Sequence, residues 1–158
     1  MIFSKSAGAI IFYRNADNQI EYLLLNHGGS REKSGIDYWN FPKGTMEKGE
    51  SEIETAKRET REETGLFNLT FLPKFKMAER YFFRERKSDG LICLIFKTVI
   101  LYLAQTENKE VKISEEHINY EWLSFERALE RIRIFRSSRK ALIMANKFLH
   151  DYLAKKSI

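Results

Sequence analysis

The spacing of apolar residues along the chain predicts four strands. Apolar and β-branched residues dominate Ser6–Arg14 and Glu21–Leu25, and the segment NADNQ between them has the composition of a turn. We therefore expect a β-hairpin there. Thr70–Phe83 and Leu91–Leu103 are also strand-like and flank the polar segment RERKSDG. Because the run LICLIF is continuously apolar, we expect its strand to be buried on both faces.

A helix is predicted between these two pairs of strands. Ser51 has the character of an N-cap, and Glu54 three residues later completes an S-x-x-E capping box. The helix should run over Glu52–Thr64, because Gly65 suits the left-handed position that follows a helix. Ile53, Ala56, Thr60 and Thr64 should form its inward side.

The C-terminal part predicts a short strand and two more helices. The strand covers Tyr120–Leu123, and Ser124 can cap a helix over FERALERI. Ser137 or Ser138 can cap a longer helix that ends near Lys155. This helix carries a stripe of apolar residues that we expect to face the core, and they are Ala141, Leu142, Ala145, Phe148, Leu149 and Tyr152.

The order of strands, helix, strands and helices indicates an α+β protein or a mixed sheet between helices. We expect a single domain over residues 1–158, because the chain has no repeats, no low-complexity tracts and no linker-like segments. Polar residues between His27 and Asp37 predict an exposed loop.

Composition and charge narrow the partners. The 158 residues are 43% hydrophobic and 31% charged, as in a folded globular protein. A net charge of +5 favours an anionic partner such as a polyphosphate or an RNA end, although a basic surface can also serve solubility alone. Cys93 is the single cysteine, and no apolar run approaches the roughly 20 residues that cross a bilayer. We expect a cytoplasmic protein without a membrane partner.

The predicted helix 52–64 concentrates acids on one side. At 100° per residue, Glu52, Glu62 and Glu63 all lie within about 60° of Glu59. A solvated charged face is the alternative, but such faces usually alternate in sign. Clustered carboxylates also destabilise a fold unless a cation neutralises them. Oxygen ligands at this density suit Mg²⁺ or Mn²⁺ better than zinc.

The segment that contains these acids resembles the Nudix box of pyrophosphohydrolases. Its specified positions are Gly44, Glu50, Arg58, Glu59, Glu62, Glu63, Gly65 and Leu66. Thr60 departs from the pattern, since the family has an aliphatic residue there. The resemblance implies an α/β/α sandwich with a central mixed β-sheet.

The resemblance also implies roles for the residues of the box. Glu59, Glu62 and Glu63 would bind the divalent ions, Mg²⁺ or Mn²⁺, with help from the backbone carbonyl of Gly44. The remaining pair would form a salt bridge that braces the loop against the helix, a structural role, and it consists of Glu50 and Arg58.

A carboxylate outside the helix often serves as the base or as an extra metal ligand in this family. Glu116 in SEEHINYEW is our candidate, with Glu115 as its competitor, and a solvated loop acid is the alternative for either. A metal-bound glutamate cluster suits the hydrolysis of phosphoanhydrides, because cations absorb the charge on the phosphate oxygens.

Three segments resemble the asymmetric diadenosine tetraphosphate hydrolases within this family, namely YWNFPKG, RETREETG and SEEHINYEW. This likeness implies that Lys43 and Lys97 contact phosphates and that Phe135 stacks on an adenine, with surface charge and core packing as the alternatives. Tyr38, also expected at the substrate, stands where the subfamily often has histidine, and Leu101 where it often has tyrosine.

The leading hypothesis is thus a hydrolase that converts diadenosine tetraphosphate to ATP and AMP. Alternatives are an RNA 5′-triphosphate end, a nucleoside triphosphate, a diphosphoinositol polyphosphate, or a non-catalytic nucleotide sensor. The loops 27–37 and 84–90 look longer than usual and flank the expected cleft, where His27 could contact substrate. We expect a monomer that binds a small dinucleoside polyphosphate or nucleotide, and no DNA duplex.

Overall fold

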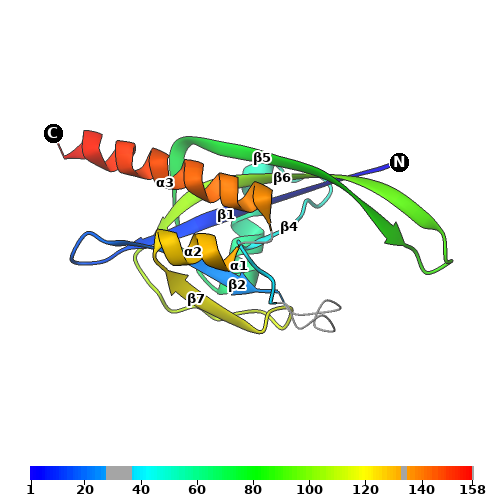
Figure 1. The fold of residues 1–158 in the computed structure, drawn as a ribbon, viewed down its shortest axis with the longest axis horizontal. Coiled ribbons are helices and arrows are strands. Elements are labelled where there is room, and N and C mark those ends of the chain that lie inside the picture. Colours follow the sequence, from blue (N-terminus) through cyan, green and yellow to red (C-terminus); the bar gives the residue numbers. More distant parts are fainter. Residues whose placement is uncertain (28–36, 133–134, 158) are drawn as a thin grey trace.

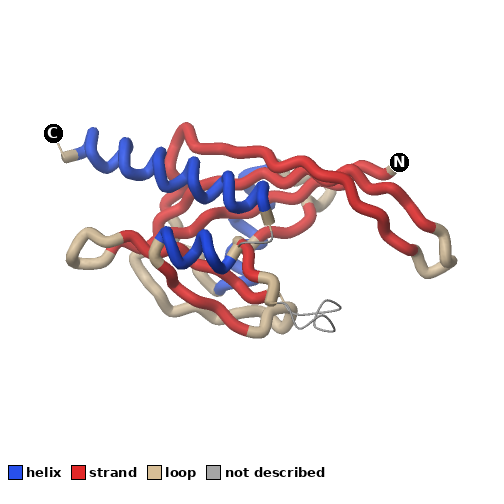
Figure 2. The backbone as a smooth tube through the Cα atoms, viewed as in Figure 1, coloured by secondary structure: helices blue, strands red, loops and turns tan. Residues whose placement is uncertain are grey.

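The computed structural model describes residues 1–27, 37–132 and 135–157 and forms a seven-stranded mixed sheet between helices (Figures 1 and 2). The α+β class and the sandwich architecture are therefore confirmed. The elements in chain order are β1 (Ile2–Arg14), β2 (Ile20–Asn26), β3 (Trp39–Asn40), β4 (Lys43–Thr45), α1 (Glu52–Thr64), β5 (Thr70–Arg86), β6 (Ile92–Thr106), β7 (Asn119–Leu123), α2 (Phe125–Arg131) and α3 (Arg136–Lys156).

The long strands lie in the order β3-β2-β1-β6-β5, with β4 paired to β1 and β7 paired to β2. The predicted hairpin is confirmed, since β1 and β2 are antiparallel and Phe12 lies opposite Tyr22. The pairing of β1 with β6 is parallel and the other pairings are antiparallel. The chain between β1 and β6 thus crosses over the sheet through α1, which makes the sheet mixed.

Helices cover the sheet on both faces (Figure 1). On one face, Ala56 of α1 packs against Ala7 and Ile100. On the other face, α2 and α3 close the main core, where Leu101 and Leu142 are fully buried. The apolar stripe predicted on α3 is confirmed as core-facing, because its two alanines at 141 and 145 and its leucines at 142 and 149 have no exposed surface.

The predicted bounds and caps of α1 are confirmed. Ser51 Oγ accepts a hydrogen bond from Glu54 N at 3.3 Å, and Glu54 Oε2 accepts one from Ser51 N at 2.7 Å. Gly65 ends the helix at φ 71°, a conformation that glycine adopts without a steric penalty. These local interactions fix where α1 starts and stops, and so which of its residues face the sheet.

The predicted cap of α3 is wrong. The helix begins at Arg136 after an N-cap at Phe135, which has no side-chain capping bond, so Ser137 and Ser138 lie inside the first turn. Phe135 N donates to Ile132 O at 2.8 Å, and the Phe135 ring packs against the main core. Tertiary packing of this ring, which no local pattern reveals, sets the start of the helix.

The strands β5 and β6 extend farther than predicted, and 84–86 belong to β5, not to a loop. A turn at Lys87–Leu91 joins the strands, with Gly90 at φ 85°. The prediction that LICLIF is buried on both faces is also wrong. Leu91, Ile92 and Leu94 are 65%, 61% and 40% exposed. This part of the hairpin projects beyond the helices on both sides of the sheet (Figure 1), so nothing among the described residues covers it.

Two very short strands, β3 and β4, have no counterpart in the sequence prediction. The predicted loop between His27 and Asp37 lies outside the described residues over 28–36. The short strand at 120–123 and the helix capped by Ser124 are confirmed as β7 and α2. No helix in the described ranges is both long and apolar enough to cross a membrane.

Candidate metal and phosphate site

Glu59 lies against the backbone of β4. A Cβ atom placed on Gly44 would be 2.0 Å from Glu59 Cδ and 2.2 Å from each of its carboxylate oxygens. Any larger residue at 44 would force the Glu59 carboxylate to move, because real Cβ atoms do not come that close to other atoms. The backbone of Gly44 and the Glu59 carboxylate therefore lie side by side, as a shared set of oxygen ligands requires.

Glu63 is the buried acid of the cluster, with 5% of its surface exposed. Its Oε2 accepts a hydrogen bond from Lys43 N at 2.9 Å, and its Oε1 is 3.8 Å from His117 Nε2. The pKa of Glu63 is raised to about 8, first of all by burial and also by the charges of Glu59 and Glu116, although the hydrogen bond from Lys43 N lowers it. The fold thus holds a carboxylate that is costly to ionise where it lies.

Glu59 and Glu116 share this electrostatic environment. The pKa of Glu59 is raised by burial and by repulsion from Glu62 and Glu116, and lowered by contact with Arg58. Glu116 itself is exposed and lies in the segment that leads into β7. Its charge acts on both Glu59 and Glu63, so a part of the chain remote in sequence brings a further acid to the cluster.

Arg58 connects the loop before α1 to the acids. Its Nε donates to Glu50 Oε1 at 2.5 Å, and its Nη2 donates to Thr45 O at 3.0 Å. Its Nη1 reaches Glu59 Oε1 at 2.8 Å and Glu62 Oε2 at 3.3 Å. Hydrogen bonds, first of all from Arg58, lower the pKa of Glu50 to about 2. The predicted Glu50–Arg58 pair is present as a contact.

Glu52, the fourth acid of the predicted face, lies outside the cluster. Glu52 forms ion pairs with Lys5 and Lys76, from β1 and β5, so it does not join the cluster. Glu62 has a side chain that is 58% exposed, and its ion pair is with Arg58. Of the predicted acidic face, Glu59 and Glu63 point furthest into the protein and Glu62 lies at its rim.

The donor set fits a hard divalent cation. It consists of carboxylate oxygens and the nearby backbone of Gly44, and it carries more negative charge than Arg58 alone offsets. Across 1–27, 37–132 and 135–157, no three acid, histidine or cysteine side chains already converge as a closed ligand set. Arg58 Nη1 lies between Glu59 and Glu62 instead, so these acids would turn from the guanidinium to a bound ion.

Two lysines lie on the other side of this cluster. Burial lowers the pKa of Lys43, and the charge of Lys97 lowers it further, whereas the charges of Glu79 and Glu63 raise it. Lys97 Nζ donates to Ser4 Oγ at 2.9 Å. The structure thus brings together the two predicted phosphate-binding lysines, from β4 and β6. A neighbouring pair of cations suits a ligand with several negative charges.

The aromatic pair predicted at the substrate also forms a contact. The ring centroids of Tyr38 and Phe135 are 5.9 Å apart, with the ring planes at 51°. Both side chains are partly buried. Phe135 packs on the main core as well, so core packing and a substrate contact are compatible for this residue.

Two histidines lie near Glu63, and the sequence analysis gave a possible substrate contact to His27 but no role to His117. His117 Nδ1 is 3.0 Å from Ser114 Oγ, and its Nε2 is 3.1 Å from His27 Nδ1. Burial lowers the pKa of both rings, that of His27 to about 3, so both are neutral at pH 7. The segment SEEHINYEW contains the signal for His117. His27 packs against His117 although a lone loop histidine usually faces solvent.

The sequence analysis did not identify Glu79 as a residue of the site. It is buried on β5, its pKa is raised by burial, and its charge acts on Lys43. Its Oε1 atom has no hydrogen-bond partner among the described residues. One acid inside a strand of mixed residues gives no periodic signal, so its place beside the lysines appears only after β5 and β4 are brought together.

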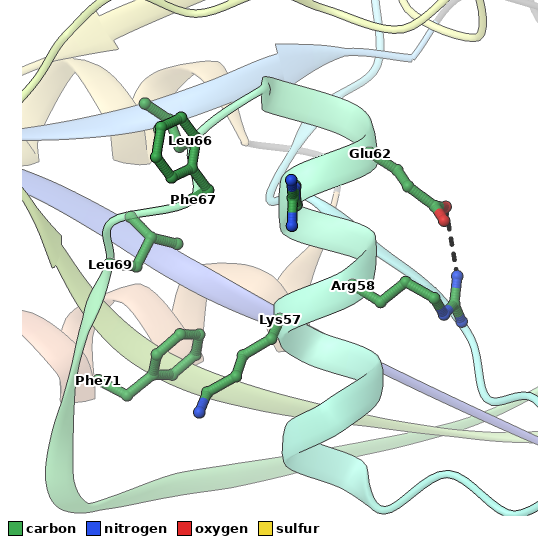
Figure 3. Close-up of a pocket in the computed structure, with 8 residues that line it drawn as sticks. Lys57, Arg58, Glu62, Leu66, Phe67, Leu69 and Phe71 are labelled. Carbon is green, nitrogen blue, oxygen red and sulfur yellow. Dashed lines mark hydrogen bonds and ion pairs between the residues drawn. The ribbon is translucent and has the colours of Figure 1, made fainter.

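A groove of about 710 Å³ lies beside α1, away from the lysines. Figure 3 shows Arg58 and Glu62 on one side of the helix, while Lys57, Leu69 and Phe71 gather on the other. The groove has an apolar wall that includes Leu66. Arg58 and Glu62 are among the residues that line it, whereas Lys43 and Glu63 are not, so the groove meets the acid cluster only at its rim.

The comparisons with known proteins follow this geometry. The sequence profile of the NUDIX domain matches residues 4–143. The chain is 36% identical over 154 residues to the asymmetrical bis(5′-nucleosyl)-tetraphosphatase of Mus musculus, covering 92% of this chain and 95% of that one. It is 31% identical to the Caenorhabditis elegans protein of the same name, covering 80% and 83%.

Solved structures of related hydrolases are also similar to this chain. A C. elegans Ap4A hydrolase binary complex matches with a TM-score of 0.76 and 28% identity, over 94% of this chain and 98% of that one. The E. coli dihydroneopterin triphosphate pyrophosphohydrolase matches with a TM-score of 0.66 at 20% identity, over 90% and 95%, a likeness in fold alone.

The burial of Glu63 predicts a gain in stability when its charge is removed. Its folded-state pKa lies above the unfolded value, so its ionisation costs stability progressively as pH rises from about 4.5 towards 8. Without divalent ions, Glu63→Gln should raise the free energy of unfolding at pH 8 by roughly 2–4 kcal/mol and change it little at pH 4.5. Urea unfolding at both pH values, in the presence of a chelator, measures this.

Glu62→Gln is the matched control, because this neighbour on α1 has an exposed side chain. It should show no comparable gain at pH 8. Equal effects of Glu63→Gln at the two pH values would contradict the assigned burial of an uncompensated charge.

Proposed function

The chain belongs to the NUDIX family of hydrolases acting on phosphoanhydride bonds, and on this basis we propose that it cleaves diadenosine tetraphosphate asymmetrically to ATP and AMP. The observation that supports this substrate is the similarity to asymmetrical tetraphosphatases over nearly the whole of both chains. Hydrolases of this family need divalent metal ions, and their relatives here act on small nucleotides.

Glu59, Glu62 and Glu63 hold the divalent ions in this proposal, together with the Gly44 carbonyl, and the ion is Mg²⁺ or Mn²⁺. The close approach of Glu59 to Gly44 and the buried charge of Glu63 support these ligands. The bound ions supply Lewis acidity, which neutralises phosphate oxygens and makes water more acidic. The hydrogen bond from Lys43 N to Glu63 Oε2 fixes the orientation of the Glu63 carboxylate.

Glu116 takes the proton of the attacking water. Its charge acts on both Glu59 and Glu63. Glu116 is exposed, so it can exchange the proton with solvent after the reaction. A general base contributes typically about 10²–10⁴ to a rate when it lies within reach of the water.

Lys43 and Lys97 bind the polyphosphate, and Tyr38 with Phe135 holds an adenine. The charge of Lys97 lowers the pKa of Lys43, and burial lowers the pKa of both lysines, so an anionic ligand would stabilise their charged forms. An aromatic face suits a base, since stacking contributes about 1–3 kcal/mol per base in nucleic-acid binders. Arg58 and Glu50 serve a structural role, because their contacts join the β4–α1 loop to the helix.

A different nucleotide substrate is the alternative within the same chemistry, such as an RNA 5′-triphosphate end or a diphosphoinositol polyphosphate. A non-catalytic sensor is less well supported, because all the acids of the box are present. We further propose that residues 1–158 form a single domain, which acts as a monomer in the cytoplasm and does not bind a DNA duplex.

A substrate panel in H₂¹⁸O with Mg²⁺ tests the proposed reaction. The panel contains diadenosine tetraphosphate, ATP, a 5′-triphosphorylated RNA and a diphosphoinositol polyphosphate. We expect ATP and AMP as the products, with one of them carrying ¹⁸O, and a kcat/KM for the dinucleotide at least about tenfold above the others, or about 1.4 kcal/mol. A preference for the RNA end would contradict the proposed substrate.

Glu116→Gln tests the proposed base. It should lower kcat by about 100-fold or more, because the water then loses its proton acceptor. Glu115→Gln, a change of the adjacent acid, should leave kcat within about twofold, as expected of a solvated surface residue. Steady-state kinetics at saturating metal measures both. The opposite order of effects would assign the role to Glu115.

A further inference from the structure

The outer part of the β5–β6 hairpin lies beyond the helices and contacts only the start of β1 among the described residues. We call residues 80–98 the arm. Its strands continue beyond α1 on one face of the sheet and beyond α3 on the other (Figures 1 and 2). Every residue from 80 to 92 is exposed. Apart from Ile95, which is buried, the arm therefore adds surface to the protein and little to its core.

This surface is strongly apolar. Of the 13 large apolar side chains that are exposed in the described residues, nine lie on the arm or in the adjoining start of β1, namely Met1, Ile2, Phe3, Tyr81, Phe82, Phe83, Leu91, Ile92 and Leu94. Single exposed apolar residues are ordinary, but a contiguous group marks a surface that is covered by something else.

The strand register sorts these residues onto two faces. Phe3 pairs with Phe96, and Phe96 pairs with Phe82, so the three rings lie on one face across three strands. Their neighbouring centroids are 5.7 Å and 4.7 Å apart. Leu94 and Ile92 continue this face toward the tip, opposite 84 and 86 of β5. We call this surface the aromatic face of the arm.

The aromatic face is also cationic. Arg80, Arg84 and Arg86 share it, because they alternate along β5 with residues of the opposite face. Glu79 and Glu85 point to that opposite face. Within the described part of the chain, none of the three arginines forms an ion pair with a carboxylate. The face thus combines unpaired positive charge with exposed apolar side chains.

A second copy of the chain does not suit this surface. β5 is an edge strand, but antiparallel pairing with its copy about any residue from 82 to 85 sets two arginines of the face opposite each other. Like charges directly opposite destabilise a strand pair. Packing two aromatic faces together would gather six arginines without an acid.

Stacked nucleobases also fit poorly. The planes of Phe3 and Phe96 are at 82°, and those of Phe82 and Phe96 are at 40°, so the three rings do not form a parallel platform. Leu94 and Ile92 have no aromatic face to offer a base. Base stacking requires flat rings that are open to the nucleotide.

We propose that the aromatic face of the arm binds the surface of an anionic lipid bilayer. The arginines contact headgroup phosphates, while Phe82, Leu94 and Ile92 enter the boundary between headgroups and acyl chains. Each basic residue near an anionic leaflet strengthens such binding, and salt weakens it. The expectation of no membrane partner rested on the lack of a spanning segment, which a surface contact does not require.

Vesicle flotation with the full chain tests this proposal. Vesicles of phosphatidylcholine alone are compared with vesicles that contain about 30% phosphatidylserine, at about 0.05 M and about 0.5 M salt. We expect the bound fraction to give an affinity about tenfold or more higher for the anionic vesicles at low salt, and most of this difference to disappear at high salt.

Variants separate the two contributions. Arg84→Glu with Arg86→Glu should lower the affinity for anionic vesicles by about tenfold or more, and Lys140→Glu with Lys147→Glu on α3 is the control matched in charge. Phe82→Ser with Leu94→Ser should weaken binding comparably, and Ile143→Ser with Met144→Ser, two exposed apolar residues of α3, is its control. All four variants should keep the turnover of soluble substrate.

Three results would overturn the proposal. The first is no binding, or equal binding to neutral and anionic vesicles. The second is a dimer that forms through the arm, detected by sedimentation and removed by the arm variants. The third is tighter binding to single-stranded RNA than to anionic vesicles at the same salt concentration.

Discussion

The buried carboxyl group of Glu63, which is costly to ionise, is the constraint around which this site is organised. A carboxylate with so little exposed surface costs free energy to ionise, and two further acids, Glu59 and Glu116, raise that cost. The surrounding structure supplies one backbone donor, from Lys43, and no cation in direct contact with Glu63 among the described residues. A divalent ion is the group that can replace the proton of Glu63, because the donor set consists of oxygens, and the chain belongs to a family of metal-dependent hydrolases.

The three-residue strand β4 joins the two halves of the site. The Lys43 backbone holds Glu63, its side chain lies with Lys97 and Glu79, and Gly44 leaves room for Glu59. Pairing with β1 fixes this strand, as Gly8 lies opposite Lys43 and a Cβ at Gly8 would be 2.1 Å from the Pro42 carbonyl oxygen. A short strand that the sequence did not predict thus sets the distance between the acids and the two lysines.

Sequence reasoning succeeded where structure is determined locally. The capping box at Ser51 and the glycine after Thr64 fix α1 by contacts within a few residues, so its bounds and its acidic side could be predicted. It failed where burial depends on remote elements. The run at 91–96 is apolar enough for a core, yet Ile95 is its only buried residue in the described structure, and Glu79 on β5 comes near Lys43 on β4 only when the sheet forms.

Calorimetric titration of the metal-free protein with Mn²⁺ at pH 7, in buffers of different ionisation enthalpy, tests the central claim most directly. The pKa of Glu63 near 8 means that this side chain holds a proton until the ion displaces it. Binding should therefore release about one proton per protein molecule, and this release should be lost in Glu63→Gln. Tight binding without proton release, or release that persists in the variant, would contradict the account.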